Sequence, residues 1–156
     1  MKKTILFFSF LFLTSASFAR VPLVNFDGQQ VSYDELIAKP KTVIFLWTTW
    51  CPYCREEIAY LNKNDSLYSD IEIIYWNVGE DKLKVGRVVN AFKIKASITK
   101  NIILDIGRVI TDKFPIVGFP TFLFFKNGKF VASENYLDED LAKDIFGPSA
   151  REAPEE

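Results

Sequence analysis

The chain has 156 residues, of which 49% are hydrophobic, so it is long and apolar enough for one domain with a substantial core. The formal charge is −1 and the 19 basic residues form no long block, which argues against a nucleic-acid-binding surface. The absence of histidine excludes a Ser-His-Asp triad, a Cys-His pair and any zinc site with a histidine ligand. Two cysteines alone cannot complete a four-ligand zinc site, so we expect no metal.

The first 19 residues have the layout of a secretory signal peptide. Lys2 and Lys3 precede an apolar run over residues 5–13, and the small residues Ser17 and Ala19 indicate cleavage after Ala19. The run is shorter than the about 20 apolar residues that cross a bilayer, although an uncleaved membrane anchor stays an alternative. In both cases we expect the domain to act in the periplasm or another extracytoplasmic space, where disulfides persist.

Residues 20–148 are expected to form the domain, and its patterns alternate between strands and helices. Strands are predicted at 21–26, 29–31, 42–47, 71–78, 102–104, 121–126 and 129–133, and helices at 32–38, from Pro52, at 83–92, 109–114 and 137–145. This order indicates an α/β fold with a mixed central sheet flanked by helices. The small, charged and proline-containing residues 149–156 are expected to be a flexible tail.

Local motifs refine the first predicted elements. The dipeptide Asp27-Gly28 favours a tight turn, so residues 29–31 are expected to pair back as an N-terminal β-hairpin. Ser32 and Glu35 have the spacing of a capping box, which predicts a brief helix through Ala38.

The two cysteines form a Cys-x-x-Cys motif where a predicted strand meets a predicted helix. The apolar run 42–47 is typical of a strand covered on both faces, and Pro52 suits the first position of a helix. Cys51 would then lie just ahead of a helix N-terminus, where unpaired N–H groups favour a thiolate. Cys54 falls on the apolar face of the helix. We therefore expect an exposed nucleophile at Cys51 and a sheltered resolving thiol at Cys54.

Several segments together resemble the thioredoxin-fold oxidoreductases. The general resemblance rests on Trp50-Cys51-Pro52-Tyr53-Cys54, on Gly118-Phe119-Pro120-Thr121 and on the Lys126-Asn127-Gly128-Lys129 hairpin. Within that superfamily, Asn25-Phe26-Asp27-Gly28, Trp47-Thr48-Thr49-Trp50 and Arg55-Glu56-Glu57 are similar to the TlpA/ResA/CcmG group of extracytoplasmic thiol–disulfide proteins. The resemblance implies a thioredoxin fold with an N-terminal β-hairpin extension. It also implies a redox-active disulfide between Cys51 and Cys54, with no other cofactor.

The resemblance implies roles for single residues as well. Glu57, three residues after the second cysteine, matches an active-site glutamate of the group, and a buried Glu57 could exchange a proton with Cys54. The alternative is a first-turn acid that only complements the helix dipole. The Phe119–Pro120 bond is expected to be cis and to leave the Phe119 backbone free to pair with an incoming peptide. Phe45 stands where cytoplasmic thioredoxins have a buried aspartate, so that group is absent here.

The residues around the dithiol are candidates for substrate binding. The expected substrate-binding residues are Trp50, Pro52, Tyr53, Phe119 and Pro120. Weaker candidates for the rim of the site lie at the end of the second predicted strand and just beyond it, although loop residues without a special role are the safer interpretation: Trp76, Glu80 and Asp81.

Together these features predict an extracytoplasmic thiol–disulfide oxidoreductase, in which Cys51 attacks a disulfide and Cys54 resolves the mixed disulfide. As the resemblance suggests, it would reduce exported proteins such as apocytochrome c and would itself be re-reduced by a membrane thiol donor. We expect a monomer without a nucleic-acid partner. The alternatives are a disulfide-donating oxidase, a glutaredoxin-like protein and, from another class, a non-catalytic peptide-binding module or holdase. The lone cysteine pattern of peroxiredoxins is missing.

Overall fold

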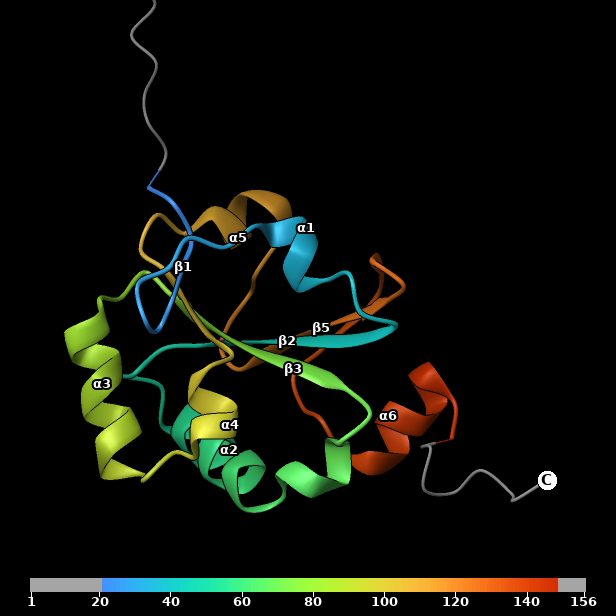
Figure 1. The fold of residues 1–156 in the computed structure, drawn as a ribbon. Coiled ribbons are helices and arrows are strands. Elements are labelled where there is room, and N and C mark those ends of the chain that lie inside the picture. Colours follow the sequence, from blue (N-terminus) through green and yellow to red (C-terminus); the bar gives the residue numbers. More distant parts are fainter. Residues whose placement is uncertain (1–20, 149–156) are drawn as a thin grey trace, which may run out of the picture.

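The computed structural model describes residues 21–148, so the predicted signal peptide at 1–19 and the predicted tail at 149–156 lie outside the described residues. Six strands form one mixed sheet in the order β1-β4-β3-β2-β5-β6 (Figure 1). The strands are β1 (Val24–Asn25), β2 (Lys41–Trp47), β3 (Glu72–Val78), β4 (Ile102–Asp105), β5 (Thr121–Lys126) and β6 (Lys129–Glu134). β2, β3 and β4 run parallel, whereas β1, β5 and β6 are antiparallel to their neighbours. The predicted mixed sheet is confirmed.

Helices cover both faces of the sheet. They are α1 (Tyr33–Leu36), α2 (Pro52–Lys63), α3 (Lys82–Ala91), α4 (Ala96–Thr99), α5 (Val109–Lys113) and α6 (Glu139–Phe146), with a 3-10 helix at Asp65–Tyr68. α1 and α5 lie on one side of the sheet, and the other helices lie on the opposite side (Figure 1). Between residues 21 and 148, no helix has the length and apolar character needed to cross a membrane.

The central strand β2 is buried on both faces. Val43, Phe45 and Trp47 join the core beneath α2, while Ile44 and Leu46 join the core beneath α1 and α5. Because successive side chains of a strand point to opposite faces, an unbroken apolar run is what two covered faces require. The sheet between the helices therefore explains the run that the sequence shows at 42–47.

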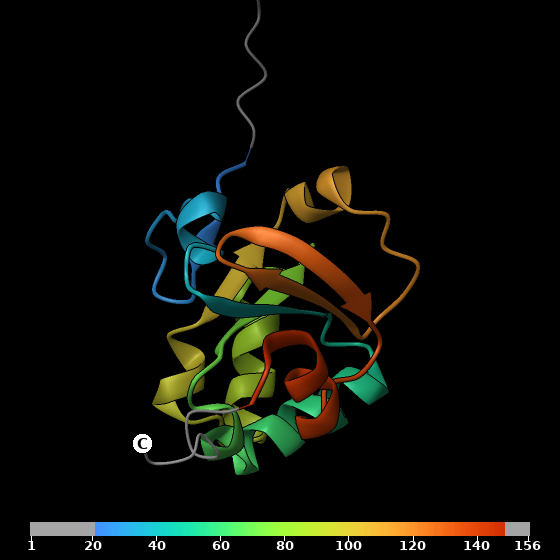
Figure 2. The ribbon, with the colours of Figure 1, turned by 90° about the vertical axis from the view of Figure 1, so that its right-hand side faces the viewer.

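The C-terminal elements close one edge of the sheet. β5 and β6 form an antiparallel hairpin, and α6 packs below them against the same core as α2 (Figure 2). The rings of Phe124 and Phe146 lie 5.9 Å apart at this contact. The carboxylate of Asp138 accepts a hydrogen bond from the Leu141 N–H at 2.8 Å and so caps the first turn of α6. Gly147, with φ at 86°, ends the helix.

The N-terminal elements are shorter than the sequence predicts. Only Val24–Asn25 forms a strand of the sheet, and Val24 also bridges Gln30, so the expected hairpin is present but small. The helix after it ends at Leu36, and Ser32 makes no side-chain capping bond, so the predicted capping box is wrong. The segment is stabilised by tertiary contacts instead, because Ile37 is buried in the core beneath α1.

Asp105, at the end of β4, is a buried acid that joins three elements. Its Oδ2 accepts hydrogen bonds from the Trp76 indole N–H and the Ile110 N–H, both at 2.9 Å, and its Oδ1 accepts one from the Val109 N–H at 2.8 Å. β3, β4 and α5 are therefore held together by one carboxylate. Removal of that carboxylate leaves three buried or half-buried donors without an acceptor.

We predict that Asp105→Ala lowers the free energy of unfolding by more than about 2 kcal/mol, because unsatisfied buried donors cost about 1–3 kcal/mol each. Urea unfolding followed by tryptophan fluorescence measures the change. Asp112→Ala, which removes an exposed acid from α5, is the control and is expected to stay within about 0.5 kcal/mol of wild type. Equal losses in both variants would contradict this role of Asp105.

Candidate active site

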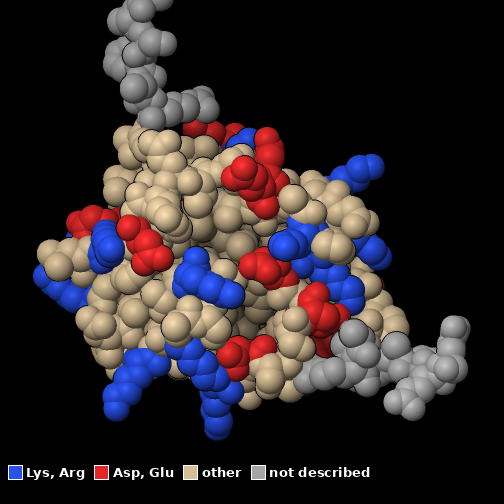
Figure 3. Space-filling view, in the orientation of Figure 1, with Lys and Arg blue, Asp and Glu red and all other residues tan. Residues whose placement is uncertain are grey.

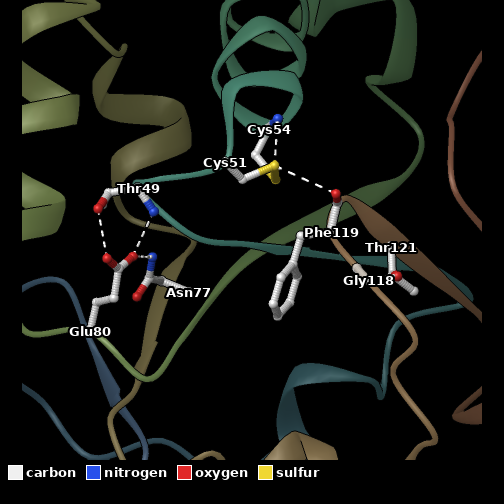
Figure 4. Close-up of a disulfide and its surroundings, with 8 residues drawn as sticks. All are labelled: Thr49, Cys51, Cys54, Asn77, Glu80, Gly118, Phe119 and Thr121. Atoms are coloured by element: carbon white, nitrogen blue, oxygen red, sulfur yellow. Dashed lines mark hydrogen bonds between the residues drawn. A yellow bond between two sulfur atoms is a disulfide. The ribbon is translucent and has the colours of Figure 1, made fainter.

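The dithiol lies where β2 ends and α2 begins. Cys51 is the N-cap residue of α2, and its Sγ accepts a hydrogen bond from the Cys54 N–H at 3.1 Å (Figure 4). Cys51 and Cys54 form a disulfide with their Cα atoms 5.3 Å apart. Pro52 occupies the first position of the helix, as predicted. The sulfur of Cys51 is thus placed among the free N–H groups of a helix N-terminus, which stabilise a thiolate.

The expectation that Cys51 is exposed is wrong for this oxidised state. Only 3% of Cys51 is exposed, and Cys54 is completely buried. The physical reason is coverage from two sides: the Cys51 sulfur is bonded to Cys54, and it lies 3.5 Å from the carbonyl oxygen of Phe119. The expected asymmetry is nevertheless present, because what little surface the pair exposes belongs to Cys51.

The Phe119–Pro120 peptide bond is cis, as the resemblance implies. It precedes β5, whose Thr121 pairs with Leu46 of β2, so the bond lies at the same edge of the sheet as the dithiol. The Phe119 carbonyl points toward the Cys51 sulfur (Figure 4). The Trp50 ring meets the Phe119 ring edge to face, with the ring centres 6.0 Å apart.

Glu57 borders a cleft beside the disulfide. The cleft has a volume of about 640 Å³, and its lining includes Tyr53, Glu56, Glu57, Phe119 and Pro120. Burial raises the pKa of Glu57 above its usual value of 4.5. One carboxyl oxygen, Oε1, is buried and has no hydrogen-bond partner among residues 21–148. The desolvation needed for proton exchange is therefore present, and the proton-exchange role itself stays a prediction.

The three weaker candidates at and after the end of β3 differ in their burial and in their contacts. Trp76 is fully buried and donates to Asp105, so it belongs to the core and not to the rim of the site. Asp81 is exposed and caps α3 by accepting a hydrogen bond from the Lys84 N–H at 2.9 Å. Glu80, in contrast, is 7% exposed and supports the segment that leads to Cys51.

Glu80 ties the end of β3 to the residues between β2 and the dithiol. Its Oε2 accepts hydrogen bonds from the Thr49 N–H at 2.6 Å and the Asn77 side-chain amide at 2.9 Å, and its Oε1 accepts one from the Thr49 hydroxyl at 2.6 Å (Figure 4). The sequence contains a signal for this pairing: neighbouring parallel strands end at one edge, so polar residues just after each strand come together. The pairing of Glu80 with Thr49 was not predicted.

No group of three potential metal ligands occurs in the part of the chain from residue 21 to residue 148. The site therefore consists of the disulfide, the cis-proline loop and the two acids. Thiol–disulfide exchange is the chemistry that such an arrangement supports, because the sulfurs themselves carry the electrons.

Comparisons with known proteins agree with this geometry. The profile of the AhpC/TSA family matches residues 15–133 of the chain. The thiol-disulfide oxidoreductase ResA of Bacillus anthracis is 27% identical over 128 residues, which cover 80% of this chain and 70% of that protein.

Two solved structures are similar in fold. A secreted disulfide oxidoreductase of Mycobacterium tuberculosis, described as homologous to E. coli DsbE, matches with a TM-score of 0.63 and 17% identity over 81% of this chain and 94% of that chain. StoA from Bacillus subtilis matches with a TM-score of 0.62 and 18% identity over 80% and 94% of the two chains. At these identities the likeness shows the fold alone, which is the predicted thioredoxin fold.

We predict that Glu80→Ala destabilises the protein by about 2 kcal/mol or more, because the Thr49 and Asn77 donors lose a buried charged acceptor. Glu80→Gln is expected to lie between the alanine variant and wild type, since it keeps one acceptor oxygen. Urea unfolding measures the order, with Glu35→Ala as an exposed control. A loss no larger than that of the control would show that the Glu80 bonds do not stabilise the fold.

The raised pKa of Glu57 predicts a pH-dependent difference in stability. The folded protein holds the Glu57 proton to a higher pH than the unfolded chain, so this residue reduces stability as the pH rises through the folded pKa. Glu57→Gln cannot ionise and escapes that loss. Its free energy of unfolding relative to wild type should therefore increase between about pH 4 and about pH 7.

Urea titrations of the oxidised proteins at several pH values test this prediction. Glu56→Gln removes the same charge from an exposed neighbouring position and serves as the matched control. If both variants change equally with pH, burial of Glu57 is not the cause.

Proposed function

Because the chain belongs to the AhpC/TSA family and is a thiol–disulfide oxidoreductase, we propose that it is a reductant that opens disulfides in exported proteins. The observation that carries the proposal is the position of the Cys51 sulfur, 3.5 Å from the Phe119 carbonyl at the side of an open cleft. A substrate strand that pairs with the backbone at Phe119 brings its own disulfide to this sulfur.

The proposed reaction starts from the reduced dithiol. The Cys51 thiolate attacks one sulfur of the substrate disulfide, that bond breaks, and the second substrate sulfur leaves and takes up a proton. Cys54, deprotonated, then attacks the Cys51 sulfur of the mixed disulfide, which forms the Cys51–Cys54 disulfide and releases the first substrate sulfur as a thiol. Two electrons and two protons pass to the substrate, and no further cofactor takes part.

The local geometry supports Cys51 as the nucleophile. Its sulfur accepts the Cys54 N–H and caps α2, and a helix N-terminus stabilises a nearby negative charge by about 0.3–1 kcal/mol, or up to about 2 kcal/mol when partly buried. Cys54 has no exposed surface, so it meets only a sulfur that is already bound to Cys51. Glu57, one helical turn after Cys54, lies on the same side of α2, and in this proposal it exchanges a proton with the Cys54 thiol.

The acid beside the dithiol segment favours the reducing direction. A strongly stabilised thiolate makes a dithiol protein an oxidant, because it stabilises the reduced form. Here the buried Glu80 places a carboxyl group against Thr49, two residues before Cys51, and negative charge there opposes the thiolate. The disulfide form is therefore favoured relative to an oxidant of this type, so the dithiol form donates electrons readily.

The surface around the disulfide suits a protein substrate. Trp50, Tyr53 and Val117 are large apolar or aromatic side chains that stay exposed beside the two cysteines. Exposed apolar groups around a polar site are typical of a surface that binds another polypeptide. The proposed substrates are exported proteins such as apocytochrome c, and the signal-peptide layout of residues 1–19 supports this extracytoplasmic setting.

Catalysis requires a source of electrons outside the cytoplasm. Each turnover leaves the Cys51–Cys54 disulfide, which must be reduced before the next substrate reacts. We propose a membrane protein with its own dithiol as the donor, because the oxidising space outside the cytoplasm holds disulfides rather than free thiols.

We predict that Cys51→Ser abolishes insulin reduction, whereas Cys54→Ser traps substrates as mixed disulfides with Cys51. Turbidity of the insulin B chain measures the first result, and mass spectrometry of trapped partners in cells measures the second. The redox potential of the wild-type pair should lie nearer to about −270 mV than to about −120 mV, the values of a reductant and an oxidant of this fold.

For each of these measurements, one outcome would contradict the proposal. Undiminished insulin reduction by Cys51→Ser excludes catalysis at this site. A potential near the oxidant value assigns the chain to disulfide donation. Peptide binding without any trapped partner or turnover favours a non-catalytic holdase.

A further inference from the structure

Two clefts lie beside the disulfide, and residues 117–119 separate them. The first is the cleft of about 640 Å³ that contains Glu56 and Glu57. The second has a volume of about 270 Å³ and contains Arg108 together with Thr48 and Trp50. The backbone residues 117–119 border both clefts, so a polypeptide that lies across them has an acidic cleft on one side and a basic cleft on the other.

The Arg108 side chain is exposed and lies against the turn that follows β3. The residue adopts a left-handed backbone conformation with φ at 55°, and its side chain lies against Gly79. A Cβ atom at Gly79 would come within 2.7 Å of the Arg108 Nε, so the lack of a side chain at Gly79 makes room for the arginine. Among residues 21–148 the Arg108 guanidinium has no ion-pair partner. An exposed cation without an ion-pair partner in the described residues therefore lines the second cleft.

Thr48 lies at the base of the same cleft and is only 2% exposed. Its hydroxyl is buried, so the Arg108 guanidinium is the charged group that this cleft offers to a ligand. Arg108 is exposed, and a guanidinium pairs well with the two oxygens of a carboxylate.

We propose that the Arg108 cleft binds an acidic side chain of the substrate polypeptide, close to the disulfide that Cys51 attacks. The proposal rests on the proposed function, because it concerns how the same site selects its substrates. A carboxylate pairs with the Arg108 guanidinium, whereas Glu56 repels it from the other cleft. The two clefts thus distinguish the two flanks of a substrate disulfide by charge.

The face seen in Figure 3 does not provide this selection. On the face seen in Figure 3, basic and acidic side chains are intermixed instead of forming one large patch of a single sign. Fields from such a mixture cancel within about a Debye length, which is about 8 Å at physiological salt. Charge selectivity must then come from individual residues that touch the substrate, such as Arg108.

Three synthetic peptides test the proposal. Each contains one Cys-x-x-Cys disulfide. The neutral peptide has glutamine on both flanks of the disulfide. In the two acidic peptides, glutamate replaces the glutamine on the amino-terminal flank or on the carboxy-terminal flank. The reduced wild-type protein should reduce one of the two acidic peptides with a kcat/KM about two- to fivefold above that of the neutral peptide. The preference should shrink at high salt.

Two variants of Arg108 and one control variant of Arg87 then test whether Arg108 causes the preference. Arg108→Gln should remove the advantage of the acidic peptide, and Arg108→Glu should make it a poorer substrate than the neutral one. Arg87→Gln loses the same charge from an exposed position on α3 and should keep the wild-type preference.

The outcomes separate the two proposals. If wild type reduces all three peptides at equal rates, or if Arg108→Gln keeps the preference, the inference is wrong and the oxidoreductase activity stands. If wild type reduces none of the peptides and no insulin, the proposed function itself fails. A preference that Arg108→Gln and Arg87→Gln lose equally would also overturn the inference, because net charge would then be its cause.

Discussion

The strand β2 is hydrogen-bonded to β3 on one side and to β5 on the other, and the site depends on where this strand ends. Its parallel pairing with β3 brings Glu80 to the edge at which Thr49 emerges. Its antiparallel pairing with β5 brings the cis Phe119–Pro120 bond to the same edge. The dithiol, the Glu80 carboxyl group and the Phe119 backbone thus meet because three strands share one boundary.

The electrostatics of the dithiol result from opposing local effects. The N-terminus of α2 and the Cys54 N–H stabilise negative charge on the Cys51 sulfur, while the nearby Glu80 carboxyl group opposes it. Glu57 is itself affected, since the burial that raises its pKa also keeps a proton near Cys54. In the reductant that we propose, this balance would favour the disulfide form. Arg108 contributes a positive charge to the lining of the second cleft.

Local sequence patterns predicted much of the fold correctly. The apolar run 42–47, the hairpin dipeptide Asn127-Gly128 and the alternating order of elements predicted the mixed sheet correctly, because each depends on side chains a few residues apart. Single-turn elements were not predictable in the same way: α4 and the 3-10 helix have no periodic stripe, and the Ser32 capping box did not form. Such short segments take their shape from the surface on which they lie.

By itself the sequence determined the pair Cys51 and Cys54, the helix that begins at Pro52 and the family to which the chain belongs, since these depend on residue type and spacing along the chain. Only the tertiary structure decided that Cys51 is almost covered, that Glu80 supports Thr49, and that Arg108 lies across residues 117–119 from the acidic cleft. These contacts join residues about 30 to 70 positions apart, and sheet pairing, which local patterns do not specify, brings them together.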